Sequence, residues 1–150
     1  MYRVSTGYTV ADAMTQEPVV ISPNKTLREA AKIMAKEHVG ALLVKEEDKI
    51  IGILTEQDIV RRGVAGTGNT ALKKVREIME TNLTTTTPDE DIFEALRIMR
   101  DYNIRHLPVM HGGKFVGLVT LKDILKIEPD LYEIMVEKIE LREAERKPVK

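Results

Sequence analysis

The sequence predicts an α+β protein made of two similar β-α-β-β-α repeats that pack sheet to sheet about a pseudo-twofold axis. Three observations lead to this prediction: an internal repeat, the same order of strand and helix signals in both halves, and a globular composition. The chain has 150 residues, 43% hydrophobic and 31% charged, so it has enough apolar side chains for a core. One repeat alone has too little chain to cover its sheet and helices, and pairing two repeats solves that problem.

The internal repeat emerges when the chain is compared with itself at an offset of 65 residues. Residues 10–62 then align with residues 75–127 without a gap, and 14 of the 53 pairs are identical. Such self-similarity at a fixed offset indicates a tandem duplication. We therefore expect repeats at 8–66 and 72–128 and a helical tail at 129–150. Glycines in 63–69 predict a flexible link between the repeats.

Each repeat shows the same elements in the same order. A short β-prone segment ends at a proline turn, and a helix with a capping-box start and one apolar face follows. Two strands joined by a turn come next, and a second helix begins at a threonine. The β-prone segments are 19–21 and 84–87, the capping boxes are Thr26 to Glu29 and Asp91 to Glu94, and the strand pairs are 41–44 with 50–54 and 107–110 with 115–119. The apolar helix positions are Leu27, Ala30, Ala31 and Met34, and Ile92, Ala95, Leu96 and Met99.

Composition and charge argue against several classes of function. The 23 Lys and Arg residues balance 24 Asp and Glu residues, whereas a nucleic-acid or anionic-membrane binder needs a basic surplus. The chain has no Cys, which excludes disulfides, thiolate metal sites and a Cys nucleophile. We also find no metal-ligand cluster, nucleophile–base pair or P-loop, so we expect neither catalysis nor a metal site. Without an apolar signal or membrane segment, we expect a cytoplasmic protein.

A T-x-x-D motif recurs in both repeats and supplies candidate binding residues. The motif comprises Thr55 and Asp58 in the first repeat, and Thr120 and Asp123 in the second. A carboxylate can accept hydrogen bonds from both hydroxyls of a ribose, and a hydroxyl with free backbone N–H groups at a helix start can bind phosphate. The same spacing is also a helix capping box with Asp in place of Glu. The residue types alone leave both interpretations open.

The duplicated pattern resembles a tandem pair of cystathionine-β-synthase (CBS) domains, a Bateman-type module, over residues 8–128. The matching stretches are 40–44 with 52–58, and 104–109 with 117–123. The resemblance implies a regulatory module that binds AMP, ADP or ATP in clefts between the repeats and signals to an effector protein. It also implies a homodimer, and no cofactor apart from this regulatory ligand. Two alternatives stay open: an S-adenosylmethionine sensor, and a structural or partner-binding module with empty clefts.

The resemblance also assigns individual ligand contacts. Arg105 and His106 match positions whose basic side chains reach phosphates, while Gly40 and Ala41 at the same positions of the first repeat are uncharged, so the two clefts are expected to differ. Each assigned residue also has an ordinary alternative role as a solvated cation, a core residue or a strand former. The assigned residues are Val19 and Thr84 for the adenine pocket, Lys122 near phosphate, and Gly40, Ala41, Ile53, Thr55, Asp58, Arg105, His106, Pro108, Thr120 and Asp123.

Overall fold

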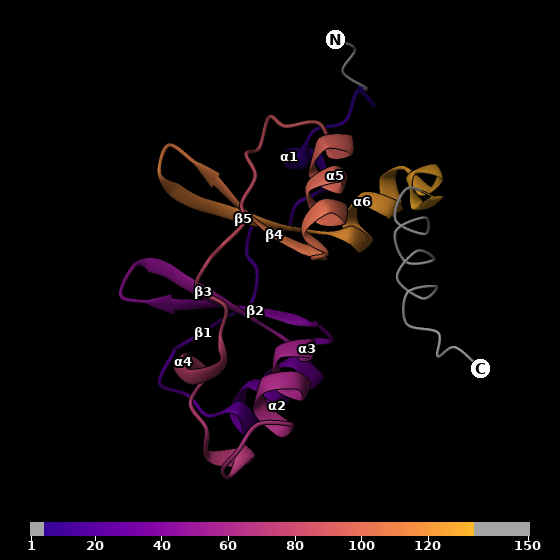
Figure 1. Cartoon of the computed structure of the whole chain (residues 1–150). Coiled ribbons are helices and arrows are strands. Elements are labelled where there is room, and N and C mark those ends of the chain that lie inside the picture. The colour runs from indigo at the N-terminus through magenta and orange to yellow at the C-terminus, as the bar shows by residue number, and fades with distance from the viewer. Residues whose placement is uncertain (1–4, 134–150) are drawn as a thin grey trace, which may run out of the picture. The chain divides into compact units, whose positions relative to one another are not determined.

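The chain folds as two units, each built around one small sheet (Figure 1). The computed structural model describes residues 5–133. The first-repeat unit comprises residues 17–84, and the second-repeat unit comprises residues 5–16 and 85–133. Each unit combines strands and helices, so the predicted α+β class is confirmed. Among the described residues, no helix is both long and apolar enough to cross a lipid bilayer.

The first-repeat unit contains a three-stranded sheet of order β1-β2-β3, with β1 parallel and β3 antiparallel to β2. The side chains at 41–44 of β2 are all buried, as the continuous apolar run predicts. The hydroxyl of Thr26 accepts from the backbone N–H of Glu29 and caps the long helix, but the reciprocal bond to the Glu29 carboxylate that the predicted capping box requires is not formed. The elements are β1 (Val20–Ile21), α2 (Leu27–Glu37), β2 (Ala41–Glu46), β3 (Lys49–Thr55), α3 (Glu56–Asp58), the π-helix η1 (Ile59–Val64), the 3₁₀ helix η2 (Thr70–Leu72) and α4 (Val75–Ile78).

The second-repeat unit contains the β4-β5 hairpin, whose turn places Gly112 and Gly113 at φ values of 58° and 76°. The predicted β-prone segment 84–87 forms only an isolated parallel bridge, between Thr86 and Val109. The elements are α1 (Val10–Ala13), α5 (Ile92–Tyr102), β4 (His106–His111), β5 (Lys114–Thr120), α6 (Leu121–Ile127) and the 3₁₀ helix η3 (Pro129–Leu131). Residues 134–150 of the predicted tail lie outside the described residues.

The two repeats exchange their first segments. Residues 8–15 begin the first repeat but pair with the second-repeat unit, where Val10 N donates to the carbonyl of Glu90 at 2.8 Å. Correspondingly, Val75 N donates to the carbonyl of Lys25 at 2.8 Å in the first-repeat unit. In Figure 1 the indigo α1 accordingly lies beside α5, which is far away in sequence. Val10 and Val75 are fully buried in the cores of the units they join.

A glycine in each sheet admits the exchanged segment. Gly117 in β5 lies so close to residues 14–15 that a Cβ atom would be 2.8 Å from the Thr15 carbonyl oxygen. Gly52 in β3 has the same relation to Met79 and Glu80, with a Cβ position 2.8 Å from the Met79 sulfur. Because these glycines occupy equivalent positions of the two repeats, the close approach is a duplicated feature of the fold.

Three details of the prediction need correction. Ala31 is exposed, whereas the other seven predicted apolar helix positions are buried. Asp91 caps α5 by accepting from the backbone N–H of Phe93 at 2.8 Å. The predicted capping box is incomplete, because the backbone N–H of Asp91 does not donate to the Glu94 carboxylate. The predicted link begins inside η1, where the carbonyl of Gly63 accepts from Thr70 Oγ1 and Lys73 Nζ.

Candidate functional site

Both T-x-x-D motifs lie at a junction where a strand passes directly into a helix. In the first-repeat unit, Thr55 Oγ1 accepts from Asp58 N at 3.2 Å, and Asp58 Oδ2 accepts from Thr55 N at 3.0 Å. In the second-repeat unit, the Thr120–Asp123 pair forms the same two bonds at 3.1 and 3.0 Å. The capping-box interpretation is therefore confirmed at both junctions. Each box uses Oδ2 of its carboxylate and leaves Oδ1 outside the reciprocal pair.

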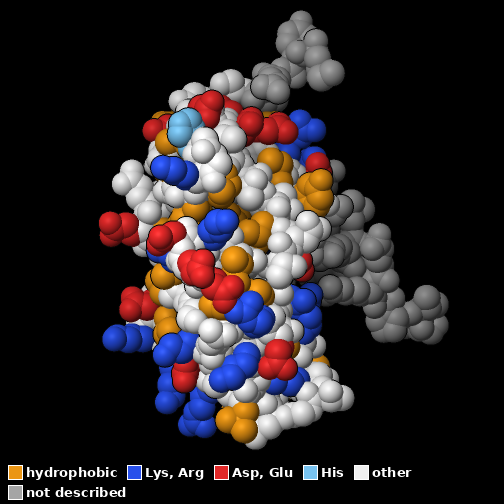
Figure 2. Space-filling model, turned by 90° about the vertical axis from the view of Figure 1, so that its left-hand side faces the viewer, with side chains coloured by type: hydrophobic (Ala, Val, Ile, Leu, Met, Phe, Trp, Pro, Cys, Tyr) orange, Lys and Arg blue, Asp and Glu red, His pale blue; other side chains and the backbone are white. Residues whose placement is uncertain are grey.

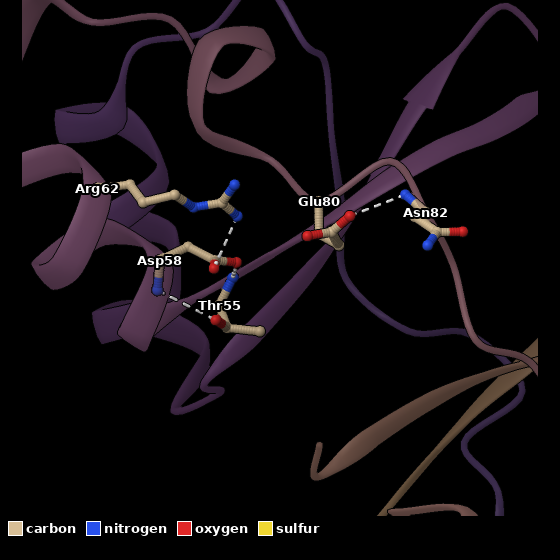
Figure 3. Close-up of polar contacts among 5 residues, drawn as sticks. All are labelled: Thr55, Asp58, Arg62, Glu80 and Asn82. Carbon is tan, nitrogen blue, oxygen red and sulfur yellow. Dashed lines mark hydrogen bonds and ion pairs between the residues drawn. The ribbon is translucent and has the colours of Figure 1, made fainter. Parts of the chain in front are cut away.

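The Oδ1 atoms of the two aspartates have different surroundings in their own helices. Asp58 Oδ1 accepts from Arg62 NH2 at 2.9 Å, one helical turn away (Figure 3). At the equivalent position of the second repeat, the residue one turn after Asp123 is the uncharged Ile127. The intrahelical ion pair of the first-repeat unit thus has no counterpart after Asp123, and a ligand meets no guanidinium from α6 at that carboxylate.

In each hairpin, the first strand starts directly opposite the strand–helix junction. His106 pairs with Thr120 in the β4–β5 register, and Leu121 N donates to the carbonyl of Arg105 at 2.9 Å. Together with Lys122 in the first turn of α6, these contacts gather the predicted basic residues around one helix start. Leu121 N and Asp123 N already donate to protein oxygens in this first turn, so the features of the second-repeat junction that favour an anion are its basic side chains, Arg105 and Lys122.

The equivalent junction of the first-repeat unit has the same backbone and different side chains. Ala41 pairs with Thr55, and Glu56 N donates to the carbonyl of Gly40 at 3.0 Å. A Cβ atom on Gly40 would lie 2.5 Å from Glu56 Oε1, so the Glu56 carboxylate occupies the space beside this glycine. A negative side chain therefore lies where the second-repeat unit carries Arg105.

The remaining predicted site residues lie in strands or next to them. Ile53 and Pro108 are buried within β3 and β4, and the Val19 carbonyl accepts from Leu43 N at 3.1 Å just before β1. Thr84 is the last residue of the first-repeat unit, while Val19 lies near its beginning. Their assignment to an adenine pocket stays a prediction from the resemblance.

Glu56, Arg62 and Glu80 were not predicted as site residues from the sequence. Glu80 lies on the exchanged segment, where its backbone pairs with Ile53 and its carboxylate accepts from Asn82 N at 2.9 Å (Figure 3). Two signals could have found these residues. The i, i+4 spacing of Asp58 and Arg62 is typical of a helical ion pair, and all three positions change charge between the repeats.

Elsewhere the surface is electrically mixed. Figure 2 shows acidic and basic side chains interspersed over the face that it presents, without a large field of one sign. In the part of the chain that the structure describes, no group of three or more His, Asp or Glu side chains is placed to hold a metal ion.

The chain is similar in sequence and in structure to known proteins of one family. The family model described as "CBS domain" matches residues 10–65 and again residues 75–130. The CBS domain-containing protein YhcV of Bacillus subtilis is 36% identical over 115 residues, which cover 77% of this chain and 81% of that protein.

Solved structures agree with this match. An uncharacterized conserved protein from Pyrococcus horikoshii aligns with a TM-score of 0.74 and 27% identity over 98% of both chains. The CBS domain pair of protein MJ0100, solved with 5′-methylthioadenosine and S-adenosyl-L-methionine, aligns with a TM-score of 0.71 and 33% identity. The alignment covers 79% of this chain and 94% of that one.

Proposed function

Because the chain belongs to the CBS-domain family and carries two copies of the domain, we propose that it is a non-catalytic regulatory module for a ligand containing adenosine. The preferred ligands are AMP, ADP or ATP, bound at the second-repeat junction. S-adenosylmethionine is the second candidate, because the related MJ0100 pair was solved with that compound.

The observation that carries this proposal is the arrangement around Asp123. Its Oδ2 is held by the backbone N–H of Thr120, which fixes the carboxylate at the helix start. An ionised carboxylate has about four acceptor positions, so a single backbone bond leaves capacity for the two hydroxyls of a ribose. The cap and the ribose contact are therefore compatible roles of one side chain.

The neighbouring basic residues explain why a phosphorylated ligand is preferred here. Arg105 immediately precedes β4, where its carbonyl accepts from Leu121 N, and Lys122 lies in the first turn of α6. A guanidinium matches the geometry of phosphate oxygens, and a lysine adds a second positive charge. With the ribose on Asp123, we expect these cations to bind the phosphate end of the same molecule.

Regulation follows if the ligand binds one arrangement of the two repeats better than another. A ligand shifts a conformational equilibrium only by its difference in affinity for the two states. The signal to an effector protein and the homodimer stay predictions from the family resemblance.

A thermal-shift panel tests the proposal. At a concentration 100 times its dissociation constant, a ligand adds about 2.7 kcal/mol of stability, which raises Tm by roughly 5–11 °C in a chain of this size. We expect such a rise with at least one of AMP, ADP, ATP and S-adenosylmethionine. Asp123→Ala should abolish the rise that AMP, ADP or ATP causes, while Asp48→Ala, which removes an exposed carboxylate from the β2–β3 turn, should preserve it. Unchanged Tm with all four compounds would favour a structural module instead.

A further inference from the structure

The two junctions share one backbone geometry and carry opposite charge. Ala41–Thr55 and His106–Thr120 are equivalent cross-strand pairs, and the adjoining backbone hydrogen bonds are 3.0 and 2.9 Å long. The capping boxes match as well, with bond lengths that differ by no more than 0.1 Å. Any difference in ligand preference must therefore come from the side chains.

Carboxylates predominate at the first-repeat junction. Glu56 lies beside Gly40, and Glu80 lies on the segment that pairs with Ile53, two residues before Thr55. Asp58 adds a third carboxylate, and Arg62, one of the two arginines of the following helix η1, is already bound to it at 2.9 Å. A phosphate brought to this junction would meet negative charge, and Arg62 could contact it only by giving up its ion pair.

The second-repeat junction carries the opposite set. Leu121 replaces Glu56, Arg105 replaces Gly40 and Lys122 replaces Gln57. On the exchanged segment, the neutral Thr15 stands in place of Glu80 and pairs with Leu118. Only Asp123 is negative among these residues, and that carboxylate is the proposed ribose ligand.

We propose that the first-repeat junction binds an adenosine compound without a 5′-phosphate, with a neutral or cationic group in its place, while the second-repeat junction binds the phosphorylated compound. This inference rests on the proposed function. Ribose recognition is shared because both junctions keep the Thr–Asp pair, and the 5′ substituent decides which junction is occupied. The module then responds to two chemically distinct adenosine pools at once.

Calorimetry with AMP and with adenosine separates the two junctions. We expect AMP to bind at the second-repeat junction, and Asp123→Asn should remove that site. At the other site, the first-repeat junction, AMP should bind at least roughly tenfold more weakly than adenosine, because juxtaposed like charges are strongly unfavourable. Adenosine binding at that other site should be lost in Asp58→Asn. Equal affinity of the first-repeat junction for both compounds would overturn this inference but leave the proposed function intact. Absence of binding by either compound would overturn this inference, whereas the proposed function is overturned only if all four compounds of the thermal-shift panel also fail.

Exchanging the charges provides the decisive variant. In the double variant Gly40→Arg with Glu56→Leu, positions 40 and 56 of the first-repeat junction receive the residues that the second-repeat junction has there. The substitution of Glu56 also removes the carboxylate that a side chain at position 40 would meet. We expect the AMP stoichiometry to rise from one to two. Glu56→Gln alone removes the charge with little change of shape and should strengthen AMP binding at this junction by roughly threefold or more. Glu37→Leu, which removes an exposed carboxylate from α2, is the matched control. If neither exchange improves AMP binding, the charge argument is wrong.

Discussion

Replacing Gly117 by Ala tests the packing that brings the exchanged segment onto the sheet next to the candidate site. The added Cβ would lie 2.8 Å from the Thr15 carbonyl oxygen and 2.9 Å from the Met14 sulfur. The methionine side chain can move, but the carbonyl is held by its neighbours. Thr15 N donates to the Leu118 carbonyl at 2.8 Å, and Leu118 N donates back to Thr15 at 3.0 Å. The substitution must therefore shift the backbone of residues 14–15.

Two opposing effects set the size of the change. Overpacking a close contact costs about 1–3 kcal/mol, whereas Gly to Ala at a tolerant position stabilises by about 0.4–1 kcal/mol through the unfolded chain. The net expectation for Gly117→Ala is a loss of roughly 0.5–2.5 kcal/mol. Gly52→Ala should lose a similar amount, because its Cβ would lie 2.8 Å from the Met79 sulfur and 3.0 Å from the Glu80 carbonyl oxygen.

The loss of stability can be measured by guanidinium-induced unfolding, in which the shift of the midpoint is converted to a free energy of unfolding with an unchanged m-value. Hydrogen exchange adds a local readout, since the amides of Thr15 and Leu118 should lose protection in Gly117→Ala before the rest of the unit does. A variant with unchanged or increased stability and full protection of these two amides would refute the close approach of the segment.

Three further predictions concern single side chains. Arg62→Ile, which copies Ile127, should free Asp58 Oδ1 and strengthen adenosine binding at the first-repeat junction by up to about fivefold in calorimetry, since exposed ion pairs contribute at most about 1 kcal/mol; weaker binding would contradict this. Burial acts to raise the pKa of Asp91, but hydrogen bonds from Phe93, Thr6 and Ser5 outweigh it and hold the pKa below its ordinary value. The ionised form therefore contributes stability above about pH 4 that is lost as the pH falls through the lowered pKa, and Asp91→Asn should flatten this acid limb in pH-dependent melting; an unaltered limb would show that another group is responsible. Thr86→Val removes a buried hydroxyl that has no hydrogen-bond partner within residues 5–133, and it should raise stability by about 1 kcal/mol in chemical unfolding, whereas a clear loss would indicate a missed partner.

Local patterns predicted the helices and hairpins well. The apolar face of α5 comprises Ile92, Ala95, Leu96 and Met99, all buried as the helical spacing predicts. The threonine-rich segment 84–87 was predicted to be a strand from β-propensity, but only Thr86 pairs with a neighbour. Propensity measures how well a residue suits a sheet, while the available strand edge decides whether it joins one.

The exchange of segments could not be predicted, and the duplication itself is the reason. Residues 10–14 and 75–79 begin with the same Val and end with the same Met, at equivalent positions of the two repeats. Either segment therefore suits either core equally well by sequence pattern. The choice depends on how the connecting chain runs, which no local pattern encodes.

The candidate site was predicted in part. Asp58 and Asp123 were found because they are identical across the repeats, and the structure places both in the same capping geometry. Glu56 and Arg62 were missed because only residues identical in both repeats were taken as candidates. These two positions matter because the second repeat has uncharged residues there, Leu121 and Ile127. In a duplicated chain, the differences between the copies carry the information about distinct ligands.

The central claim is that the Asp123 carboxylate binds both ribose hydroxyls of an adenosine ligand, and comparing AMP with 2′-deoxy-AMP tests it most directly. Hydrogen bonds to a charged group contribute about 1.5–3 kcal/mol, so calorimetry on the unmodified protein should show 2′-deoxy-AMP binding roughly 10–100-fold more weakly. In Asp123→Asn, which removes this site, AMP should bind no better than 2′-deoxy-AMP binds to the unmodified protein. Equal affinity of the unmodified protein for the two nucleotides would contradict the account.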